Sequence, residues 1–388
     1  DLAGADPRTL RPAGDNVGDI TLAAGKLLRT GTGRLEVAAA RDIKLLGATS
    51  AIYTAGKRGP DVANFTAPTI SGKQVEFPTD GGDLSLTAGG SIVATAATQL
   101  PSAWLYRQGR VNADGTPAAA NNRVAWWLNY QDFAQGVGTL GGGDVTIRAG
   151  GNVSNLGVSL PSNARLPSTL GSVPNPADLV LQGGGDLDLR AGGNVGSGLF
   201  LLGAGTGRVQ AGGDIAAART ASGGRSINTI ALLQDGRLEL DAGGSVALDA
   251  VVNPTVLAQV TGNTTSVAST KKNYFFSYSD RAGVDARALT GNVDFTQSTL
   301  AVLAGYPSSP TADQPALRLL PPNLAAAAFG GDITVGSTDG STMYPAALGN
   351  LALLAGGDVR LAQTLAMSDL APASLPSIAA PASAFSAV

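Results

Sequence analysis

The chain of 388 residues contains neither cysteine nor histidine. These absences exclude disulfide scaffolds, zinc and haem sites with nitrogen or sulfur ligands, Ser-His-Asp triads and Cys-His pairs. A lack of cysteine is also common in bacterial proteins that cross a periplasm unfolded, because a stray disulfide would block export. We therefore expect a location outside the cytoplasm.

Large side chains and helix formers are scarce as well. Aromatic residues make up 5% of the chain and charged residues 14%, and Glu36, Glu76 and Glu239 are the only glutamates among 29 acidic residues. Glycine is abundant, with 53 residues. Because aspartate favours turns and glutamate favours helices, this composition predicts little helix. It fits one elongated repeat domain better than globular domains with large cores.

Charge and hydropathy argue against two classes of partner. The net charge is −3 and the arginines are dispersed, so the clustered positive face that a phosphate backbone needs is missing. No apolar run approaches the roughly 20 residues of a membrane helix. We expect a soluble protein with no nucleic-acid partner and no membrane span. The chain starts at Asp1 without a signal peptide, which we interpret as a processed or excerpted piece.

A short phrase recurs along the chain: Gly-Asp, an alternating apolar strand, Ala-Gly-Gly, a small polar residue and a second strand. GGDLSLTAGGSIVA from Gly81 and GGDVTIRAGGNVSN from Gly142 are clear copies. Apolar and polar residues alternate within the strands, which places one face inward. In six copies the first apolar residues of the two strands are eight positions apart: Leu35/Ile43, Leu84/Ile92, Val145/Val153, Leu187/Val195, Leu238/Val246 and Leu351/Val359.

The Ala-Gly-Gly between the two strands predicts a corner. Glycine adopts backbone angles that other residues resist, and the small Asp, Asn or Ser that follows can hydrogen-bond the backbone nearby. Stacked coils would align these corners into ladders, with each strand about 4.8 Å from its counterpart one coil away. The repeat therefore predicts an all-β protein, a parallel β-helix or β-solenoid with loop insertions.

The rival repeat is the calcium-binding nonapeptide roll, whose pattern is echoed between Gly183 and Leu189. Its tandem nine-residue period is missing, so successive aspartates do not line up to hold calcium between turns. We interpret the Gly-Asp pairs as turns. No cofactor is expected, and calcium is the one alternative.

We expect a single β-helical shaft over 1–370, with insertions at about 97–138, 158–178 and 251–328 where the phrase is interrupted. The Ala-, Pro- and Ser-rich segment 371–388 is expected to be a linker or a strap along the shaft, because it has no alternating strand.

The first insertion carries the candidate binding residues, which are Trp104, Tyr106, Trp126, Trp127 and Tyr130. Such rings suit stacking on sugars and would form a platform for glycan or partner contact. The alternative is a small core, because large aromatics on an insertion usually pack it back onto the shaft.

Polysaccharide lyases and hydrolases also occur on parallel β-helices, where they use clustered acidic residues. The tight acidic groupings outside the repeated turns are Asp186 with Asp188, Asp241 with Asp249, and Asp280 with Asp285. We interpret each as a solvent-facing strand or loop residue. No catalytic or metal-binding residue and no enzyme activity are predicted.

Four further segments accompany the coil phrases: YQDFAQGVG from Tyr130, YFFSY from Tyr274, LALLAGGD from Leu351 and MSD from Met367. With these segments the chain resembles, over nearly its whole length, the filamentous-haemagglutinin-like exoproteins of Gram-negative bacteria, which are very large secreted adhesins. The resemblance implies a right-handed β-helical shaft and export through an outer-membrane two-partner-secretion transporter. It also implies roles in adhesion, biofilm formation, virulence or contact-dependent competition. The family's N-terminal secretion domain and C-terminal toxin-like segment have no counterpart here.

We therefore expect a structural shaft segment of a secreted filament or adhesin at the bacterial cell surface. The expected partners are the secretion transporter, host or bacterial surface glycans and proteins, and a second copy joined end to end at open coil edges. The alternative is a polysaccharide-binding or polysaccharide-processing module that uses the Trp-containing insertion.

Overall fold

The computed structural model describes residues 18–67, 69–70, 73–97, 99, 101–108, 124–167, 178–220, 226–257, 277–296, 319–336, 341–344, 346 and 348–367. The expected linker at 371–388 lies outside these residues. Within them the chain is nearly all β-strand, interrupted by the short 3-10 helices η1 (Pro101–Ala103) and η3 (Pro254–Val256). In this part of the chain no helix has the length and apolar character needed to span a membrane.

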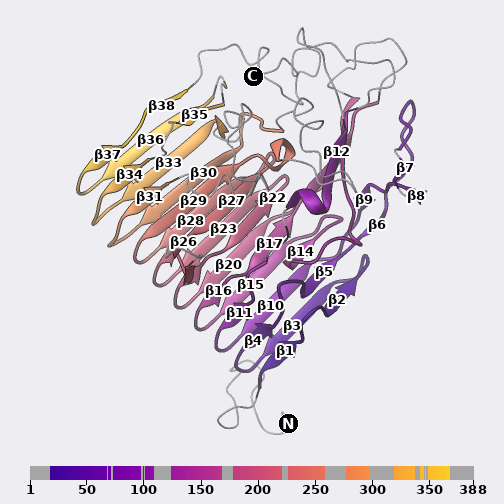
Figure 1. Ribbon diagram of the computed structural model, residues 1–388, viewed down its shortest axis with the longest axis horizontal. Coiled ribbons are helices and arrows are strands. Elements are labelled where there is room, and N and C mark those ends of the chain that lie inside the picture. The colour runs from indigo at the N-terminus through magenta and orange to yellow at the C-terminus, as the bar shows by residue number, and fades with distance from the viewer. Residues whose placement is uncertain are drawn as a thin grey trace.

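We call each successive repeat of strand, corner and strand a pass of the chain. The first long sheet has nine parallel strands, one from each of nine successive passes. Neighbouring strands pair in register, so that Leu84 of one pass lies between Leu35 and Val145 of the adjacent passes. Figure 1 shows the strands side by side in chain order. They are β3 (Leu35–Ala39), β10 (Leu84–Ala88), β15 (Val145–Ala149), β20 (Leu187–Ala191), β23 (Thr206–Ala211), β28 (Arg237–Ala242), β30 (Gly283–Ala288), β33 (Asn323–Ala328) and β36 (Asn350–Ala355).

The second long sheet has sixteen strands in two parallel rows. The first row begins after the corner of each pass and contains β1 (Ile20–Leu22), β4 (Ile43–Leu45), β11 (Ile92–Ala94), β16 (Val153–Ser154), β21 (Val195–Gly196), β24 (Ile215–Ala216), β29 (Val246–Val252), β31 (Val293–Phe295), β34 (Ile333–Val335) and β37 (Val359–Leu361). The second row contains β2 (Leu27–Thr30), β5 (Ala51–Thr54), β14 (Gly136–Thr139), β17 (Gly157–Leu160), β22 (Leu199–Leu202) and β27 (Thr229–Leu233). Strand β29 is long enough to pair with both rows, and this joins them.

Smaller sheets accompany the two long ones. Three parallel strands, β32 (Leu319–Leu320), β35 (Ser341–Met343) and β38 (Leu365–Met367), form one of them. Antiparallel pairs are formed by β6 (Lys57–Arg58) with β9 (Pro78–Thr79), β7 (Thr69–Ile70) with β8 (Lys73–Gln74), and β25 (Arg219–Thr220) with β26 (Ser226–Ile227). The expectation of an all-β fold dominated by long parallel sheets is confirmed.

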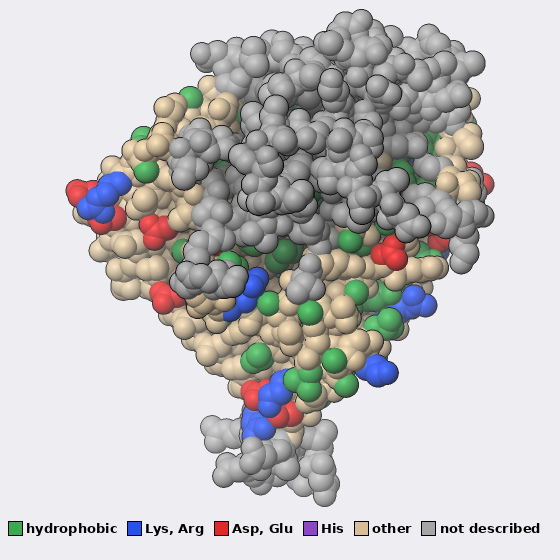
Figure 2. Space-filling view, viewed as in Figure 1, with side chains coloured by type: hydrophobic (Ala, Val, Ile, Leu, Met, Phe, Trp, Pro, Cys, Tyr) green, Lys and Arg blue, Asp and Glu red, His purple; other side chains and the backbone are tan. Residues whose placement is uncertain are grey.

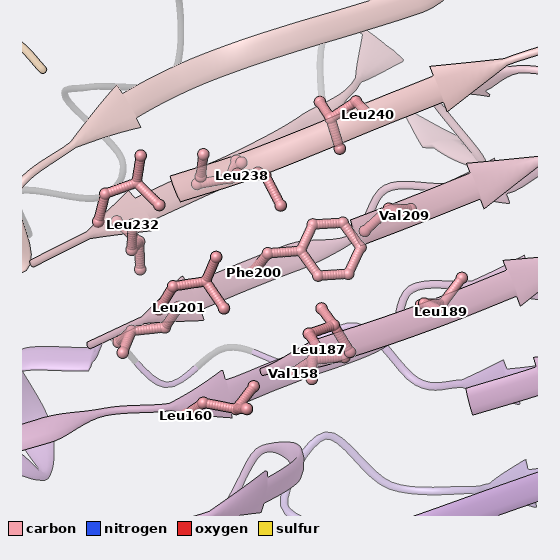
Figure 3. Packing of buried hydrophobic residues seen from close by; sticks show 14 of the residues in the cluster. Val158, Leu160, Leu187, Leu189, Phe200, Leu201, Val209, Leu232, Leu238 and Leu240 are labelled. Atoms are coloured by element: carbon pink, nitrogen blue, oxygen red, sulfur yellow. The ribbon is translucent and has the colours of Figure 1, made fainter. Parts of the chain in front are cut away.

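Alternation along the strands separates the core from solvent. In β20, Leu187 and Leu189 are buried, whereas Asp188 and Arg190 between and after them are partly exposed or exposed. Figure 3 shows these leucines in line with Val209, Leu238 and Leu240 of the next two passes, and with Phe200 of β22 pointing into the same core. Each buried CH₂ group contributes about 0.8 kcal/mol, so every pass extends the core by a similar amount.

A continuous row of side-chain hydrogen bonds runs along the corners. At each corner before the last described one, the small polar residue accepts a hydrogen bond from the backbone N–H of the corresponding residue one pass later, at donor–acceptor distances of 2.7–3.2 Å. We call this row the corner ladder. Its ten members are Asp19, Asp42, Ser91, Asn152, Asn194, Asp214, Ser245, Asn292, Asp332 and Asp358.

The Gly-Asp pairs that open the phrase form a shorter row of the same kind. Asp83, Asp144 and Asp186 each accept from the backbone N–H of the next pass, and the last donor is Thr206. These bonds give the surface amides a partner, so the strands β10, β15, β20 and β23 are held in register at both ends. The aspartates therefore act as turn residues that link one pass to the next.

Parts of the expected insertions belong to the long sheets, and their boundaries are corrected accordingly. Strands β14 and β17 extend into 97–138 and 158–178, and β30, β31 and β33 lie within 251–328. The corners at 289–292 and 329–332 have one residue more than the others, which changes the eight-residue offset to nine. The pass that contains β23 escaped the pattern because Gly207 stands at its first apolar position.

We predict that Gly192→Ala is strongly destabilising. A Cβ atom at Gly192 would lie 2.3 Å from the carbonyl oxygen of Gly150 in the preceding corner, so the two corners would have to separate. The expected cost is about 1–3 kcal/mol, measured as the shift in the denaturant midpoint. Gly33→Ala is the matched control, because no atom lies within 4 Å of a Cβ built there. Equal losses for both variants would contradict the close packing of the corners.

The two ends of the corner ladder predict a loss of stability in acid. Hydrogen bonds from Arg41 and Lys44 hold the pKa of Asp19 well below its ordinary value of 3.8. The Asp358 backbone N–H, followed by Arg360, lowers the pKa of Asp332. Figure 2 shows acidic and basic side chains gathered together at both ends of the stack.

Because these carboxylates have lower pKa values in the folded than in the unfolded chain, their stabilisation is complete above pH 3.8 and is lost as the pH falls through the folded-state values. We expect the melting temperature to drop between about pH 4 and about pH 2. Asp332→Asn keeps an acceptor for the Asp358 N–H and removes the titrating charge, so its melting temperature should depend less on pH. A profile as steep as that of the original chain would argue against this origin.

Candidate functional site

The first two expected insertions meet in one antiparallel sheet. It consists of β12 (Leu105–Gln108), β13 (Ala125–Leu128), β18 (Ser162–Arg165) and β19 (Val180–Gly183). These strands leave the parallel stack on either side of β14 and β17, which are neighbours one pass apart. The register of the stack therefore brings the two insertions together.

The predicted aromatic residues lie inside this region. Trp104 and Trp126 are 0% and 1% exposed and belong to the main core, where the ring of Trp104 meets Phe133 edge-on at 5.0 Å. Trp127 and Tyr106 are 3% and 8% exposed, and their rings stack at 6.2 Å. Burial thus corrects the interpretation of these four rings as an open glycan platform. Trp127 and Tyr106 form the small core that was the alternative, whereas Trp104 and Trp126 join the main core, and all four rings fix the insertion to the stack.

Polar contacts support this small core. The Tyr106 hydroxyl donates to the carboxylate of Asp132 at 3.2 Å. Burial, followed by the charge of Asp132, raises the pKa of Tyr106 to about 12, so the hydroxyl remains a donor at neutral pH. Arg107 is buried, and its Nη1 donates to the carbonyl oxygen of Leu257 at 2.7 Å. The third expected insertion is therefore connected to the first through its residues next to η3.

Tyr130, the fifth predicted residue, has a different setting. It is only partly buried, and it lines an open groove of about 240 Å³ at the ends of β2 and β5, beside β6 and β9. Three cations, Arg29, Lys57 and Arg58, and one carboxylate, Glu76, also line this groove. We call it the cationic groove. Here a predicted site residue lies beside several charged groups that are exposed or partly exposed.

A chain of hydrogen bonds orders one wall of the cationic groove. Nη1 of Arg29 donates to the Tyr53 hydroxyl at 3.5 Å, and this hydroxyl donates to the carbonyl oxygen of Tyr130 at 3.4 Å. The Tyr130 hydroxyl then donates to Glu76 at 3.3 Å. The bond to Tyr53 raises the pKa of the Arg29 guanidinium, so Arg29 remains charged. Burial and the nearby Glu76 charge raise the pKa of Tyr130.

The cations of the groove differ in their partners. Lys57 pairs with Asp80 at 2.9 Å and Arg58 with Asp61 at 2.8 Å, both at exposed positions. Arg29 has no carboxylate partner within the described part of the chain. Arg165 does not line the groove; it is buried over the face of Phe77, with its Cζ 4.6 Å from the ring centroid, and burial lowers its pKa. A bound anion in the groove would meet positive charge from several sides.

The acidic groupings of the sequence are distributed over separate contacts. Asp188 pairs with Arg148 and Arg190, and Asp285 pairs with Arg287 at 2.5 Å. Asp249 differs from the expected solvent-facing position, because it is 1% exposed and accepts from the side chain of Asn228 at 3.0 Å. Among the residues that the structure describes, no three acidic side chains lie close enough together to hold a metal ion.

Comparison with protein-family models, with curated proteins and with solved structures finds no match for this chain.

Sequence reasoning predicted Tyr130 but none of the charged residues of the cationic groove. Arg29, Glu76 and Tyr130 are far apart in the chain, and the pairing of Arg29 with Tyr53 between β2 and β5 brings them together. The segments Leu27–Thr30 and Ala51–Thr54 both end in threonine, and aligning them would have placed Arg29 beside Tyr53. These strands follow the phrase rather than belong to it, so the repeat gives no signal for their alignment.

We predict that Trp126→Ala destabilises the protein by about 3–5 kcal/mol, because it leaves a cavity in the main core. Phe329→Ala is the control, since this aromatic residue is 56% exposed and its loss should cost no more than about 0.5 kcal/mol. Denaturant unfolding followed by tryptophan fluorescence compares the two. A fully stable Trp126→Ala variant would show that the ring is a surface residue after all.

Proposed function

We propose that this chain is a right-handed parallel β-helix that serves as a shaft segment of a secreted bacterial surface filament or adhesin. The observation that carries the proposal is the corner ladder, which runs without a break from Asp19 to Asp358 and fixes ten successive corners in one line. A stack held in this way is stiff along its axis, since every pass is paired in register with the passes beside it. Stiffness and length are what a shaft requires.

The last described pass supports the same proposal. Its inward-facing residues Leu351, Val359 and Leu361 are 41%, 45% and 52% exposed, whereas Ile333 and Val335 one pass earlier are at most 6% exposed. Among the described residues, strands β36 and β37 each pair on one side only. Unpaired strand edges with exposed apolar side chains are templates for further strands. We propose that further coils of the same cross-section continue the stack here, within a longer chain or by end-to-end association.

The resemblance to filamentous-haemagglutinin-like exoproteins supplies the setting of the proposal. In it the chain is exported by an outer-membrane two-partner-secretion transporter and displayed at the cell surface, where it takes part in adhesion, biofilm formation or contact between cells. The absence of cysteine suits this route, because no disulfide can form before export is complete.

Immunogold labelling of bacteria that carry the chain tests this function. Antibodies against the purified chain should label intact cells, with gold particles at a distance from the outer membrane, and deletion of the chain should reduce attachment to surfaces. A cytoplasmic protein labelled in the same sections is the control for cell integrity. Label that appears only after the cells are permeabilised would overturn the proposal.

A further inference from the structure

The cationic groove combines charges that select for one kind of ligand. Arg29 offers a cation without a carboxylate partner in the described part of the chain, and Lys57 and Arg58 add positive charge next to it. Glu76 brings a negative charge and acceptor oxygens to the same groove. The groove therefore offers an attractive site for an anionic group and, next to it, acceptors for hydroxyl groups.

We propose that the cationic groove binds a hydroxylated carboxylate, namely a uronate unit of an acidic polysaccharide. The inference deepens the proposed adhesin function, because it gives the surface ligand a chemical class. It places that ligand at the ends of β2 and β5, beside Tyr130, and not on the predicted tryptophans.

Arg29 is the group that would hold the carboxylate. Its side chain is exposed on β2, and its one hydrogen bond among the described residues is the long contact of 3.5 Å from Nη1 to Tyr53. Most of the donors of the planar guanidinium are therefore free for a two-point contact with a carboxylate, which is the geometry that arginine favours. Tyr53 holds the guanidinium at the groove wall and so reduces the entropy lost on binding.

Glu76 and Tyr130 would recognise the rest of the sugar. The Tyr130 hydroxyl occupies one Glu76 oxygen, which leaves the other oxygen to accept from a sugar hydroxyl. The partly buried ring of Tyr130 offers an apolar surface to the C–H face of a sugar. A sugar hydroxyl can donate to the free Glu76 oxygen, whereas an unprotonated phosphate oxygen cannot, and this directs the selectivity toward uronates.

The size of the groove fits a single sugar unit. Its volume of about 240 Å³ is below the range of about 300–1,000 Å³ that is usual for drug-sized ligands. One uronate bound by one arginine gives weak affinity, but a filament with many copies would gain avidity on a polysaccharide that repeats the same unit. Repeated grooves on the filament and repeated uronate units on the polysaccharide are consistent with a shaft that attaches along its length.

Calorimetric titration of the purified chain with an oligogalacturonate tests the inference, with a neutral galactose oligomer of the same length and inorganic phosphate as comparison probes. The acidic oligomer should bind, the neutral oligomer should bind at least about tenfold more weakly, and phosphate should compete poorly. Equal binding of both oligomers, or displacement by phosphate as effective as by free galacturonate, would overturn the assignment. Absence of any binding of the acidic oligomer would overturn it too.

Variants locate the site. Arg29→Gln should weaken binding of the oligogalacturonate by about tenfold or more. Arg34→Gln removes the same charge from an exposed arginine that already pairs with Glu36, and it should change binding by no more than about twofold. Equal effects of the two variants would show that net charge is responsible and not the groove. Unchanged melting temperatures establish that both variants are folded.

The outcome is separate from that of the shaft proposal. A chain that fails to bind uronates but labels at the surface of intact cells refutes the groove assignment and leaves the shaft in place. A chain that binds uronates through Arg29 but labels only in permeabilised cells keeps the groove assignment and removes its surface role.

Discussion

The structure depends on one interaction repeated at every corner, the hydrogen bond from a backbone N–H to a small side-chain oxygen of the pass before. The residue must be short enough to stay at the corner and must carry an acceptor. Asp, Asn and Ser all meet these conditions, and all three accept the same bond in the corner ladder. Once this bond fixes the register, the two corner glycines approach the next pair, the strands pair in parallel, and Leu187, Val209 and Leu238 come to face the same core.

This constraint explains where the chain is free to vary. Each pass must return to the corner, but the path between two strands of the second long sheet has no such requirement, and long excursions cost little extra loop-closure entropy. The chain leaves after β11 and returns at β14 only after the aromatic strands β12 and β13. Trp104 in the main core and the small core around Trp127 fix this excursion to the stack. Residues from separate segments can then lie together next to the excursion, as Arg29, Glu76 and Tyr130 do in the cationic groove.

The corner phrase predicted the parallel strands and the alternation, because both follow from the local pattern of the sequence. It placed the small polar residues at the corners but expected them to bond the backbone nearby, whereas they accept from the backbone of the next pass. It missed the pass with Gly207, where the side chain of Leu202 fills the place of the absent apolar residue: a Cβ at Gly207 would lie 2.6 Å from Leu202 Cδ1. It also missed β30 and β33, whose corners are one residue longer. The candidate site was less predictable. An aromatic residue looks the same in sequence whether it stacks on sugar or is buried, and the cationic groove arises from pairing between passes.

Amide hydrogen exchange at the corners tests the central claim most directly. The corner residues that donate along the ladder, such as Asn194 and Asp214, lie at the surface, so their amides would exchange rapidly without the side-chain acceptor of the neighbouring pass. The corner ladder predicts slow exchange, comparable with that of the paired strand amides. Exchange at these corners as fast as in unstructured peptides would contradict the ladder, and with it the register on which the fold is built.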